Sequence, residues 1–288
     1  MKLIRVFPRR TKATPNDELA YVGPPDLFTD QADEVHVSVA FSCDKPTAER
    51  LAYEWQGMAR TVKLGGPAYK MRSEEFVPGK YIKPGYVITS RGCPRGCWFC
   101  DVPKRENDYH GAPPRELAIA EGWNILDDNL LACSRPHVES VFAMLRRQGR
   151  RVEFTGGLEA LSLQDYQVGL LADLTPRPNC FFAYDPGDAF ETLQSAGRRL
   201  IAAGFTARSH RLRCYVLIGH PNDTFSQAEK RLREIAGVGF TPHAMLWRPD
   251  DAIPSQLKWK PKSEWKGFQR LWSRPAIIHA RASSYVST

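Results

Sequence analysis

Apolar and polar residues alternate in short runs along this chain, and the period of the alternation switches repeatedly between strand-like and helix-like. Residues 35–41, Val-His-Val-Ser-Val-Ala-Phe, alternate with a period of two and predict a strand, as do residues 3–7. Residues 46–56 begin with proline and have the spacing of a helix, and residues 62–67 read as a strand that ends in Gly-Gly-Pro. Strand, helix and strand in this order predict a parallel pair, so residues 1–84 are expected to form a small α/β appendage and linker.

From residue 86 onward, strands and helices alternate regularly. The same patterning predicts strands at 86–89, 122–129, 151–155, 179–185, 211–219 and 241–248. It predicts helices at 114–121, 135–148, 162–172, 190–204 and 226–236, the second of them opened by Ser134 as N-cap. Such alternation requires right-handed parallel crossovers, so residues 85–248 are expected to form an α/β barrel or a doubly wound sheet.

Composition narrows the class of protein only moderately. Of the 288 residues, 42% are hydrophobic and 25% are charged, as in ordinary globular proteins. No stretch approaches the roughly 20 apolar residues that span a bilayer, so no membrane partner is expected. The first residues, Met-Lys-Leu-Ile-Arg-Val, read as a strand rather than a cleavable signal, and a cytoplasmic protein with reduced thiols is expected.

Three cysteines stand close together directly after the apolar run 86–89. Cys93, Cys97 and Cys100 have the spacing C-x3-C-x2-C in a segment rich in glycine and proline. A strand that leads into such a loop can wrap the loop around one compact object, and thiolates are soft ligands that suit zinc or iron–sulfur centres. Three ligands are one fewer than a closed zinc site or a fully protein-ligated cubane cluster requires, so one metal position is left open.

With the aromatic Phe99 just before the third cysteine, this motif resembles the signature of the radical S-adenosylmethionine (SAM) superfamily. The resemblance implies a 4Fe–4S cluster held by Cys93, Cys97 and Cys100, with SAM chelating the remaining iron through its amino and carboxylate groups. It implies a partial (β/α)6 barrel, similar to a TIM barrel, with the active site at the C-terminal ends of the strands. It also implies an external one-electron reductant of the flavodoxin or ferredoxin type, cleavage of SAM to a 5′-deoxyadenosyl radical, and abstraction of hydrogen from a substrate.

Other interpretations of the cysteines remain open. A structural zinc site would need a fourth ligand, for which His110 is the nearest candidate, and the protein would then be a non-enzymatic, zinc-dependent nucleic-acid-binding module. A disulfide is disfavoured because seven cysteines is an odd number and no signal peptide precedes them. The four remaining cysteines are scattered and supply no second cluster: Cys43, Cys133, Cys180 and Cys214.

The N-terminal appendage resembles a shortened form of the Rossmann-like domain that precedes the barrel in cobalamin-binding radical SAM proteins. A strand that ends in Gly-Gly-Pro is frequent there. The motif Asp-x-His-x-x-Gly, which would supply an axial histidine, does not occur in this chain, and His36 lies inside a predicted strand with no glycine after it. Cobalamin is therefore not expected as a cofactor, and His36 is expected to be a core or surface residue.

Acidic residues end the second predicted strand. Asp127 and Asp128 belong to an Asp-Asp-Asn segment that resembles the one common in cobalamin-type radical SAM enzymes. The resemblance implies that one of these carboxylates receives the ammonium group of SAM, which needs carboxylate or carbonyl acceptors. The alternative is that they cap the following helix.

Later strands also end in polar residues. Tyr184 and Asp185 end the fourth strand, and the resemblance makes them candidates for the ribose or carboxylate of SAM, with core packing and helix capping as alternatives. Residues 216–221 resemble the family's fifth-strand segment, which implies that Gly219, together with Phe99, lines the adenine site. His220 follows, and it is a candidate for donating a proton or binding substrate, or for capping the loop.

The C-terminal segment is basic and rich in tryptophan. The whole chain has a formal net charge of +8; residues 244–288 contain eight Lys or Arg and three Asp or Glu, so the segment alone contributes +5. Cations interleaved with flat rings suit a nucleic acid, so residues 249–288 are expected either to bind nucleic acid or to cap the barrel through a helix at 263–272. The substrate is accordingly expected to be a nucleotide or nucleic-acid base, with a small metabolite or a peptide as alternatives.

Overall fold

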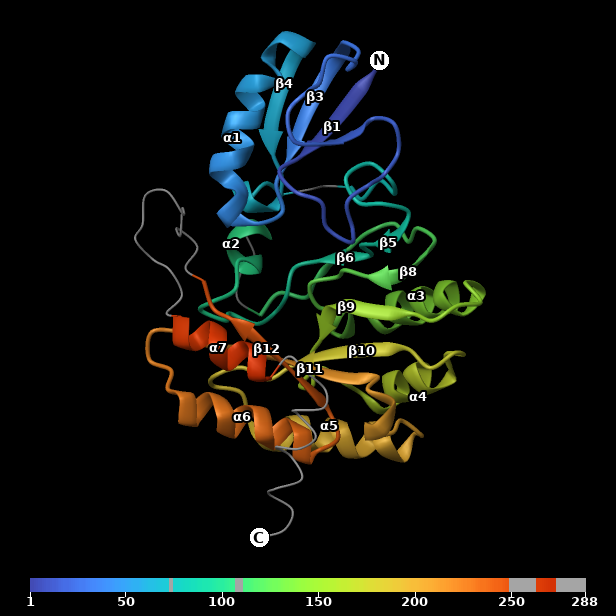
Figure 1. Cartoon of the computed structure of the whole chain (residues 1–288). Coiled ribbons are helices and arrows are strands. Elements are labelled where there is room, and N and C mark those ends of the chain that lie inside the picture. The colour runs from blue at the N-terminus through green and yellow to red at the C-terminus, as the bar shows by residue number, and fades with distance from the viewer. Residues whose placement is uncertain (73–74, 107–110, 249–262, 273–288) are drawn as a thin grey trace. The chain divides into compact units, whose positions relative to one another are not determined.

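The computed structural model describes residues 1–72, 75–106, 111–248 and 263–272, and these residues form two compact units (Figure 1). The first unit contains residues 1–87 together with 92–106 and 111–112. The second contains residues 88–91 and 113–248 together with helix α7, Ser263–Leu271.

A four-stranded parallel sheet in the order β2-β1-β3-β4 forms the first unit. Its strands are β1 (Leu3–Phe7), β2 (Ala20–Val22), β3 (Ala32–Ser38) and β4 (Ala59–Gly65), and helix α1 (Lys45–Glu54) connects β3 to β4. The predicted strand–helix–strand pair is therefore confirmed as parallel. Strand β2 was not predicted, because three residues are too few to establish a period.

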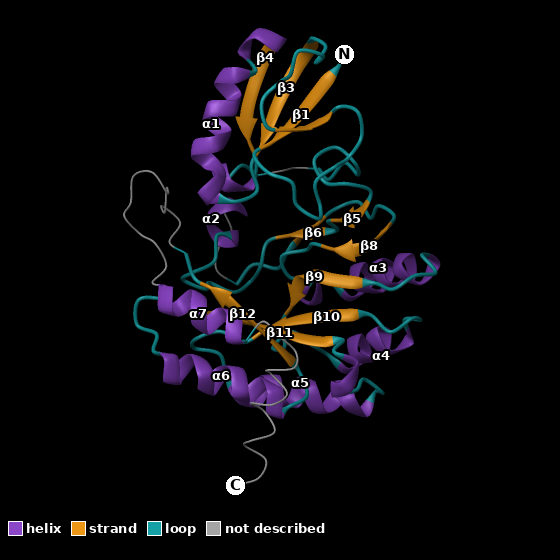
Figure 2. Cartoon of the chain, viewed as in Figure 1, coloured by secondary structure: helices purple, strands orange, loops and turns teal. Residues whose placement is uncertain are grey.

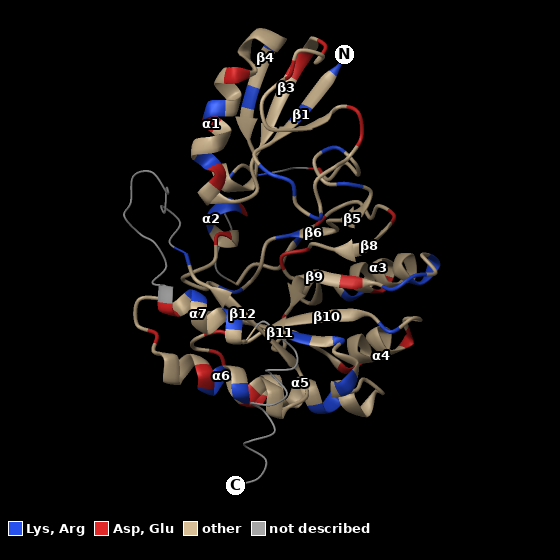
Figure 3. Cartoon of the chain, viewed as in Figure 1, with Lys and Arg blue, Asp and Glu red and all other residues tan. Residues whose placement is uncertain are grey.

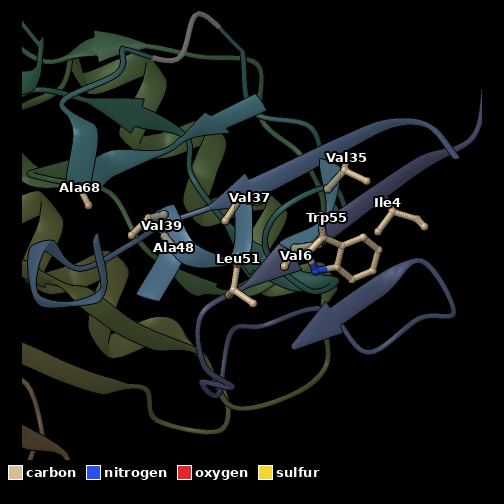
Figure 4. Packing of buried hydrophobic residues seen from close by; sticks show 9 residues of the cluster. All are labelled: Ile4, Val6, Val35, Val37, Val39, Ala48, Leu51, Trp55 and Ala68. Carbon is tan, nitrogen blue, oxygen red and sulfur yellow. The ribbon is translucent and has the colours of Figure 1, made fainter. Parts of the chain in front are cut away.

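Alternation along these strands decides which face of the sheet is buried. One face of the sheet, formed by Ile4, Val6, Val35 and Val37, packs against Leu51 of α1 and Trp55 at its end, as Figure 4 shows. All six are at most 1% exposed. Burial of one such aliphatic side chain stabilises the fold by about 1.5–3 kcal/mol, so this face supplies the unit's hydrophobic core.

A second, six-stranded sheet has the order β12-β11-β10-β9-β8-β5 (Figure 2). Its strands are β5 (Gly85–Val87), β8 (Gly122–Ile125), β9 (Glu153–Leu158), β10 (Asn179–Ala183), β11 (Leu212–Ile218) and β12 (Thr241–Leu246). The strands from β8 to β12 pair in parallel, each with its neighbour. The helices between them are α3 (Arg135–Arg147), α4 (Asp165–Asp173), α5 (Phe190–Ala202) and α6 (Phe225–Gly237). The α/β class predicted for this chain is thereby confirmed.

Local chemistry explains where two of these helices begin. The Ser134 side chain accepts a hydrogen bond from the His137 amide, so Ser134 is the N-cap of α3 as its sequence predicts. Thr224 and Gln227 form a reciprocal capping box at the start of α6.

The helix predicted at 114–121 is wrong. Pro113 and Pro114 stand directly before residues Arg115–Glu116 (β7), which pair antiparallel with Ser90–Arg91 (β6) instead. The Leu117 amide also donates to the Thr89 carbonyl at 2.8 Å, so pairing with the chain before it satisfies this backbone. A short helix that was not predicted, α2 (Val102–Glu106), lies directly after the cysteines.

Helix α7 matches the helix predicted at 263–272. Its aromatic residues recur at helical spacing, with Phe268 9% exposed and Trp272, just after the helix, fully buried. Trp265 packs edge-on to Phe268, with ring centroids 5.6 Å apart. The rest of the basic C-terminal segment lies outside the described residues, including Trp259. Among the helices that the structure describes, none combines the length and apolar character needed to cross a bilayer.

Candidate functional site

The three cysteines of the C-x3-C-x2-C motif lie on one loop of the first unit. Cys93, Cys97 and Cys100 are all half-buried, and the Cys100 amide donates to the Cys97 carbonyl at 3.0 Å, which tightens the end of the loop. Phe99 packs edge-on against Trp98, with ring centroids 5.4 Å apart. The motif therefore presents three partly accessible thiols within eight residues of chain.

The donor set suits a soft metal centre in its chemistry, because accessible thiols can ionise and bind metal. In the ranges that the structure describes, however, no three Cys, His, Asp or Glu side chains lie close enough together to hold a metal ion. His110, the candidate fourth ligand, lies outside the described residues.

Burial separates three of the four other cysteines from the motif; Cys43 is half-buried. Cys133, Cys180 and Cys214 are at most 8% exposed. Burial raises the pKa of Cys133 to about 12 and also raises the pKa values of Cys180 and Cys214. These three thiols stay protonated at neutral pH and are core residues. None of the seven cysteines, all of which the structure describes, forms a disulfide.

Asp127 follows β8 and is held deep inside the second unit, with 1% of its surface exposed. One carboxylate oxygen accepts from the Thr89 amide at 2.6 Å. The other accepts from the Thr89 hydroxyl at 2.5 Å and the Ser90 hydroxyl at 2.7 Å. Burial raises the pKa of the Asp127 carboxyl, although these donors oppose the rise. The carboxyl thus fixes residues 89 and 90, and Cys93 follows only three residues later in the chain.

Asp128 points to a different partner. Its side chain, 8% exposed, forms an ion pair with Arg91 at 3.3 Å. Neither Asp127 nor Asp128 caps helix α3, whose N-cap is Ser134. The capping alternative for the two aspartates is therefore wrong, because their carboxylates are engaged with residues 89–91. Arg91 is a site residue that the sequence did not identify, since nothing in a single sequence ties it to a residue 37 positions away.

Strand β9 passes the end of β8 very closely. A Cβ atom at Gly156 would lie 2.4 Å from the Asp127 carbonyl oxygen and 2.6 Å from the Leu126 carbonyl carbon. Only glycine can occupy this position without displacing the backbone that carries Asp127. Beyond it, Glu159 accepts from the side-chain Nδ2 of Asn129 at 2.8 Å and from the Ser162 hydroxyl at 2.6 Å.

Strand β10 ends in two residues with separate partners. The Tyr184 hydroxyl donates to Glu234 of α6 at 3.1 Å, and Tyr184 is 7% exposed. Asp185 accepts from the Leu217 amide at 3.0 Å, so it ties β10 to β11, and its own amide donates to Asp188 at 2.7 Å. Tyr184 thus packs toward a helix, whereas Asp185 lies at the strand ends.

The end of β11 is built around an aspartate that the sequence did not single out. The Asp223 side chain, with no exposed surface, accepts from the Gly219 amide at 2.8 Å and from Arg231 at 3.0 and 2.9 Å. Arg231 also donates to the Leu217 carbonyl at 3.0 Å. Because Asp223 and Arg231 pair inside the fold, and Asp223 holds Gly219 while Arg231 holds Leu217, this network fixes the backbone at the strand end.

Two predicted site residues lie on this network. Gly219 has a φ of +72°, and a Cβ there would meet the Trp265 indole at 3.1 Å, so α7 packs directly on it. The His220 ring lies 3.8 Å from an oxygen of Asp223. Burial lowers the pKa of His220, and the nearby Arg231 lowers it further while Asp223 opposes the change. A neutral imidazole at pH 7 results.

His36, the histidine weighed for cobalamin, is engaged by protein groups in the first unit. Its ring nitrogens lie 2.5 Å from the Tyr81 hydroxyl and 2.9 Å from Glu34, which also pairs with Lys63 at 3.0 Å. The ring is therefore a hydrogen-bonded surface residue on the sheet face that α1 does not cover.

Basic residues within the described ranges are also engaged. Arginines gather at the end of α3 and in the loop after it (Figure 3). Among them, Arg147 pairs with Glu121 at 2.7 Å and Arg150 lies 3.7 Å above the ring of Trp123. These contacts account for their positions without a polyanionic partner.

Comparison with protein-family models finds no match for this chain, and comparison with curated protein sequences finds none either.

Proposed function

We propose that the protein is a radical SAM enzyme. The observation that carries this proposal is the contrast among its cysteines: three half-buried thiols with C-x3-C-x2-C spacing share one loop, while the three other strand or core thiols are buried and protonated. A 4Fe–4S cluster bound there would supply the electron that cleaves SAM to methionine and a 5′-deoxyadenosyl radical. Cys93, Cys97 and Cys100 would hold it as thiolates.

The strand order supports a partial barrel as the finer fold. In a doubly wound sheet the strand order reverses at a switch point, whereas a barrel adds each strand next to the one before it. The order β12-β11-β10-β9-β8-β5 runs without reversal along the chain, apart from the short β6–β7 pair. We therefore assign a partial (β/α)6 barrel whose site lies at the carboxyl ends of the strands.

For the polar part of SAM we propose Asp128 and Asp185 as the groups that bind or orient it. Both are carboxylates at strand ends, and neither is as deeply buried as Asp127. Asp127 is a positioning residue, because its oxygens are taken by Thr89 and Ser90. Tyr184 supports the β10 end through Glu234 rather than touching SAM.

Phe99 and the backbone of Gly219 remain the proposed adenine contacts, because Leu246 and Trp265 already occupy the space where a side chain at position 219 would lie. His220, neutral at pH 7 and next to Gly219, is the proposed group for proton donation or substrate binding. We propose that turnover needs an external one-electron reductant and no cobalamin, since both nitrogens of His36 have protein partners. A cobalamin absorption spectrum that survives gel filtration at near-stoichiometric occupancy would contradict the second point.

The test is iron, sulfide and zinc analysis of protein purified without oxygen, followed by an assay for 5′-deoxyadenosine with SAM and dithionite. Cys97→Ala should lose cluster and product, whereas Cys43→Ala, which removes another half-buried thiol outside the motif, should keep both. Zinc without sulfide in the wild type would favour the zinc-module alternative. Formation of 5′-deoxyadenosine by Cys97→Ala at the wild-type level would contradict the proposal.

A further inference from the structure

Strands β11 and β12 bury only one of their two faces. Alternate residues of β11 and β12 are fully or nearly fully buried on the face where α6 packs. The residues between them, on the opposite face, are half-buried or exposed. In the carboxyl half of the strands that face carries five residues, which we call the ring shelf: Ala183, Tyr215, Leu217, His243 and Met245.

The ring shelf is aromatic and apolar, and it contains no charged side chain. Tyr215 lies opposite Ala183 on one neighbouring strand and opposite His243 on the other. The Tyr215 ring stacks on Phe181, with centroids 5.0 Å apart and planes at 19°. His243 stands nearly perpendicular to Tyr215, with centroids 5.4 Å apart. The tyrosine ring is thus held in place by its neighbours.

Both polar rings of the shelf are neutral at physiological pH. Desolvation raises the pKa of Tyr215 to about 12, so its hydroxyl stays a hydrogen-bond donor. Desolvation, followed by the charge of Arg213, lowers the pKa of His243. The residue is nevertheless partly accessible to solvent. The shelf therefore offers ring faces and uncharged hydrogen-bonding edges.

A positive charge lies one residue pair below the shelf. Arg213 points to the same face as Tyr215, with its guanidinium carbon 5.1 Å from the centre of the Phe181 ring, and its Nε donates to the His210 carbonyl. On the same face, the Glu153 carboxylate accepts hydrogen bonds from the side-chain amides of Asn124 and Asn179 at 3.2 and 3.1 Å. Among the described residues, Arg213 forms no ion pair with a carboxylate, so its charge is available to an anion.

We propose that the ring shelf and Arg213 bind a nucleotide, with the base against Tyr215 and His243 and the phosphate at Arg213. A flat ring gains stacking energy from such a platform, and a guanidinium is well suited to a phosphate. SAM carries no phosphate that could lie at Arg213. This inference rests on the proposed function, since it assigns the substrate class of that enzyme. A free nucleotide and a nucleotide within a single strand share this chemistry.

The test is equilibrium dialysis of the full-length protein, purified without oxygen, against three sets of probes. These are the four ribonucleoside 5′-monophosphates, the matching nucleosides, and a short single-stranded oligonucleotide. At least one monophosphate should bind more tightly than its nucleoside. A preference for the oligonucleotide would identify a strand as the source of the nucleotide, and a preference for the monophosphate would identify a free metabolite.

Variants then test the site. His243→Ala, at an exposed position, should weaken binding of the preferred probe by about 5- to 150-fold, the loss expected for one stacking contact. Arg213→Gln should weaken monophosphate binding and leave nucleoside binding unchanged. The matched control is Tyr53→Ala, at a 74% exposed ring on α1, which should change neither.

Failure of this inference can be told apart from failure of the proposed function. Cys97→Ala should retain nucleotide binding, because the shelf does not depend on the cysteine loop for its contacts. The proposal would be overturned, even if SAM is cleaved, by either of two results. One is that no probe binds at millimolar concentration; the other is that His243→Ala and Arg213→Gln bind the probes as tightly as the wild type. Nucleotide binding without SAM cleavage would instead overturn the proposed reaction.

Discussion

Replacing Asp127 tests whether its carboxyl holds the segment that leads into the cysteine motif. The structure gives this carboxyl three donors, the Thr89 amide and the hydroxyls of Thr89 and Ser90, at 2.6, 2.5 and 2.7 Å. Two substitutions separate the possible reasons for its importance. Asp127→Ala removes every acceptor, whereas Asp127→Asn keeps the shape and one oxygen.

The expected magnitudes follow from counting donors. In Asp127→Ala the buried Thr89 amide loses its partner, which costs about 1–3 kcal/mol, and each stranded hydroxyl adds about 1 kcal/mol, for a total of about 3–5 kcal/mol. In Asp127→Asn the amide keeps its acceptor, and both hydroxyls can rotate to accept from the new NH2 group. The Asn variant should therefore lose only about 0.5–1.5 kcal/mol, the contribution of one neutral hydrogen bond.

The raised pKa of Asp127 adds a dependence on pH. Its folded-state pKa lies above the ordinary value of 3.8, chiefly because the group is buried. Stability from the protonated carboxyl is then fully present below the unfolded pKa and is lost as pH rises through the folded pKa. Asparagine does not titrate. The stability difference between wild type and Asp127→Asn should consequently grow as pH falls through that window.

Urea unfolding followed by tryptophan fluorescence measures these differences at each pH. Asp165→Asn is the matched control, because Asp165 is 91% exposed and pairs with Arg199 at the surface; it should cost no more than about 1 kcal/mol. If Asp127→Asn costs as much as Asp127→Ala, the ionised carboxylate is essential and the argument from burial fails. If Asp127→Ala costs less than the surface control, the segment is held by something else.

Three further predictions concern the second unit. Gly156→Ala should destabilise the protein by about 1–3 kcal/mol in urea unfolding, because its Cβ would meet backbone at 2.4 Å. The control Gly169→Ala lies in α4 with no atom within 4 Å of the new Cβ and should stabilise the protein by up to about 1 kcal/mol. Equal effects of the two substitutions would refute the close-approach argument. Trp272→Ala should cost about 3–5 kcal/mol in the same measurement, because the side chain is fully buried, and a cost below 1 kcal/mol would show that α7 contributes little to the core. Tyr184→Phe should lower the free energy of unfolding by about 0.5–1.5 kcal/mol, because the hydrogen bond to Glu234 is lost. SAM affinity, measured by equilibrium dialysis, should not change. A tenfold loss of SAM affinity would instead make Tyr184 a direct contact.

The strands and helices could be predicted because each buries one face, and burial imposes a period on the sequence. Strand β1 and helix α3 fall within a residue of their predicted bounds for this reason. The helix predicted at 114–121 failed because its backbone is paired with residues 90 and 91, and such pairing leaves no periodic signal in a two-residue strand.

For the candidate site, the sequence predicted only that its residues lie at the ends of the strands. The sequence indicated that polar residues end β8, β10 and β11, and the structure describes polar side chains there. Their partners could not be predicted, because Asp127 reaches a residue 38 positions earlier and Asp185 reaches the next strand. Asp223 was missed for the same reason, since its partner Arg231 lies eight residues later, on helix α6.

The uneven burial of the seven cysteines determines which thiols would be oxidised when the protein is exposed to air. Oxidants act on accessible thiolates, so damage should be confined to Cys43 and the three motif cysteines, while the protonated core thiols persist. A sample that has lost its motif thiols to reversible oxidation would keep its circular dichroism and its unfolding midpoint. Treatment with a reductant under nitrogen should then restore four rapidly alkylated thiols per chain without any refolding step.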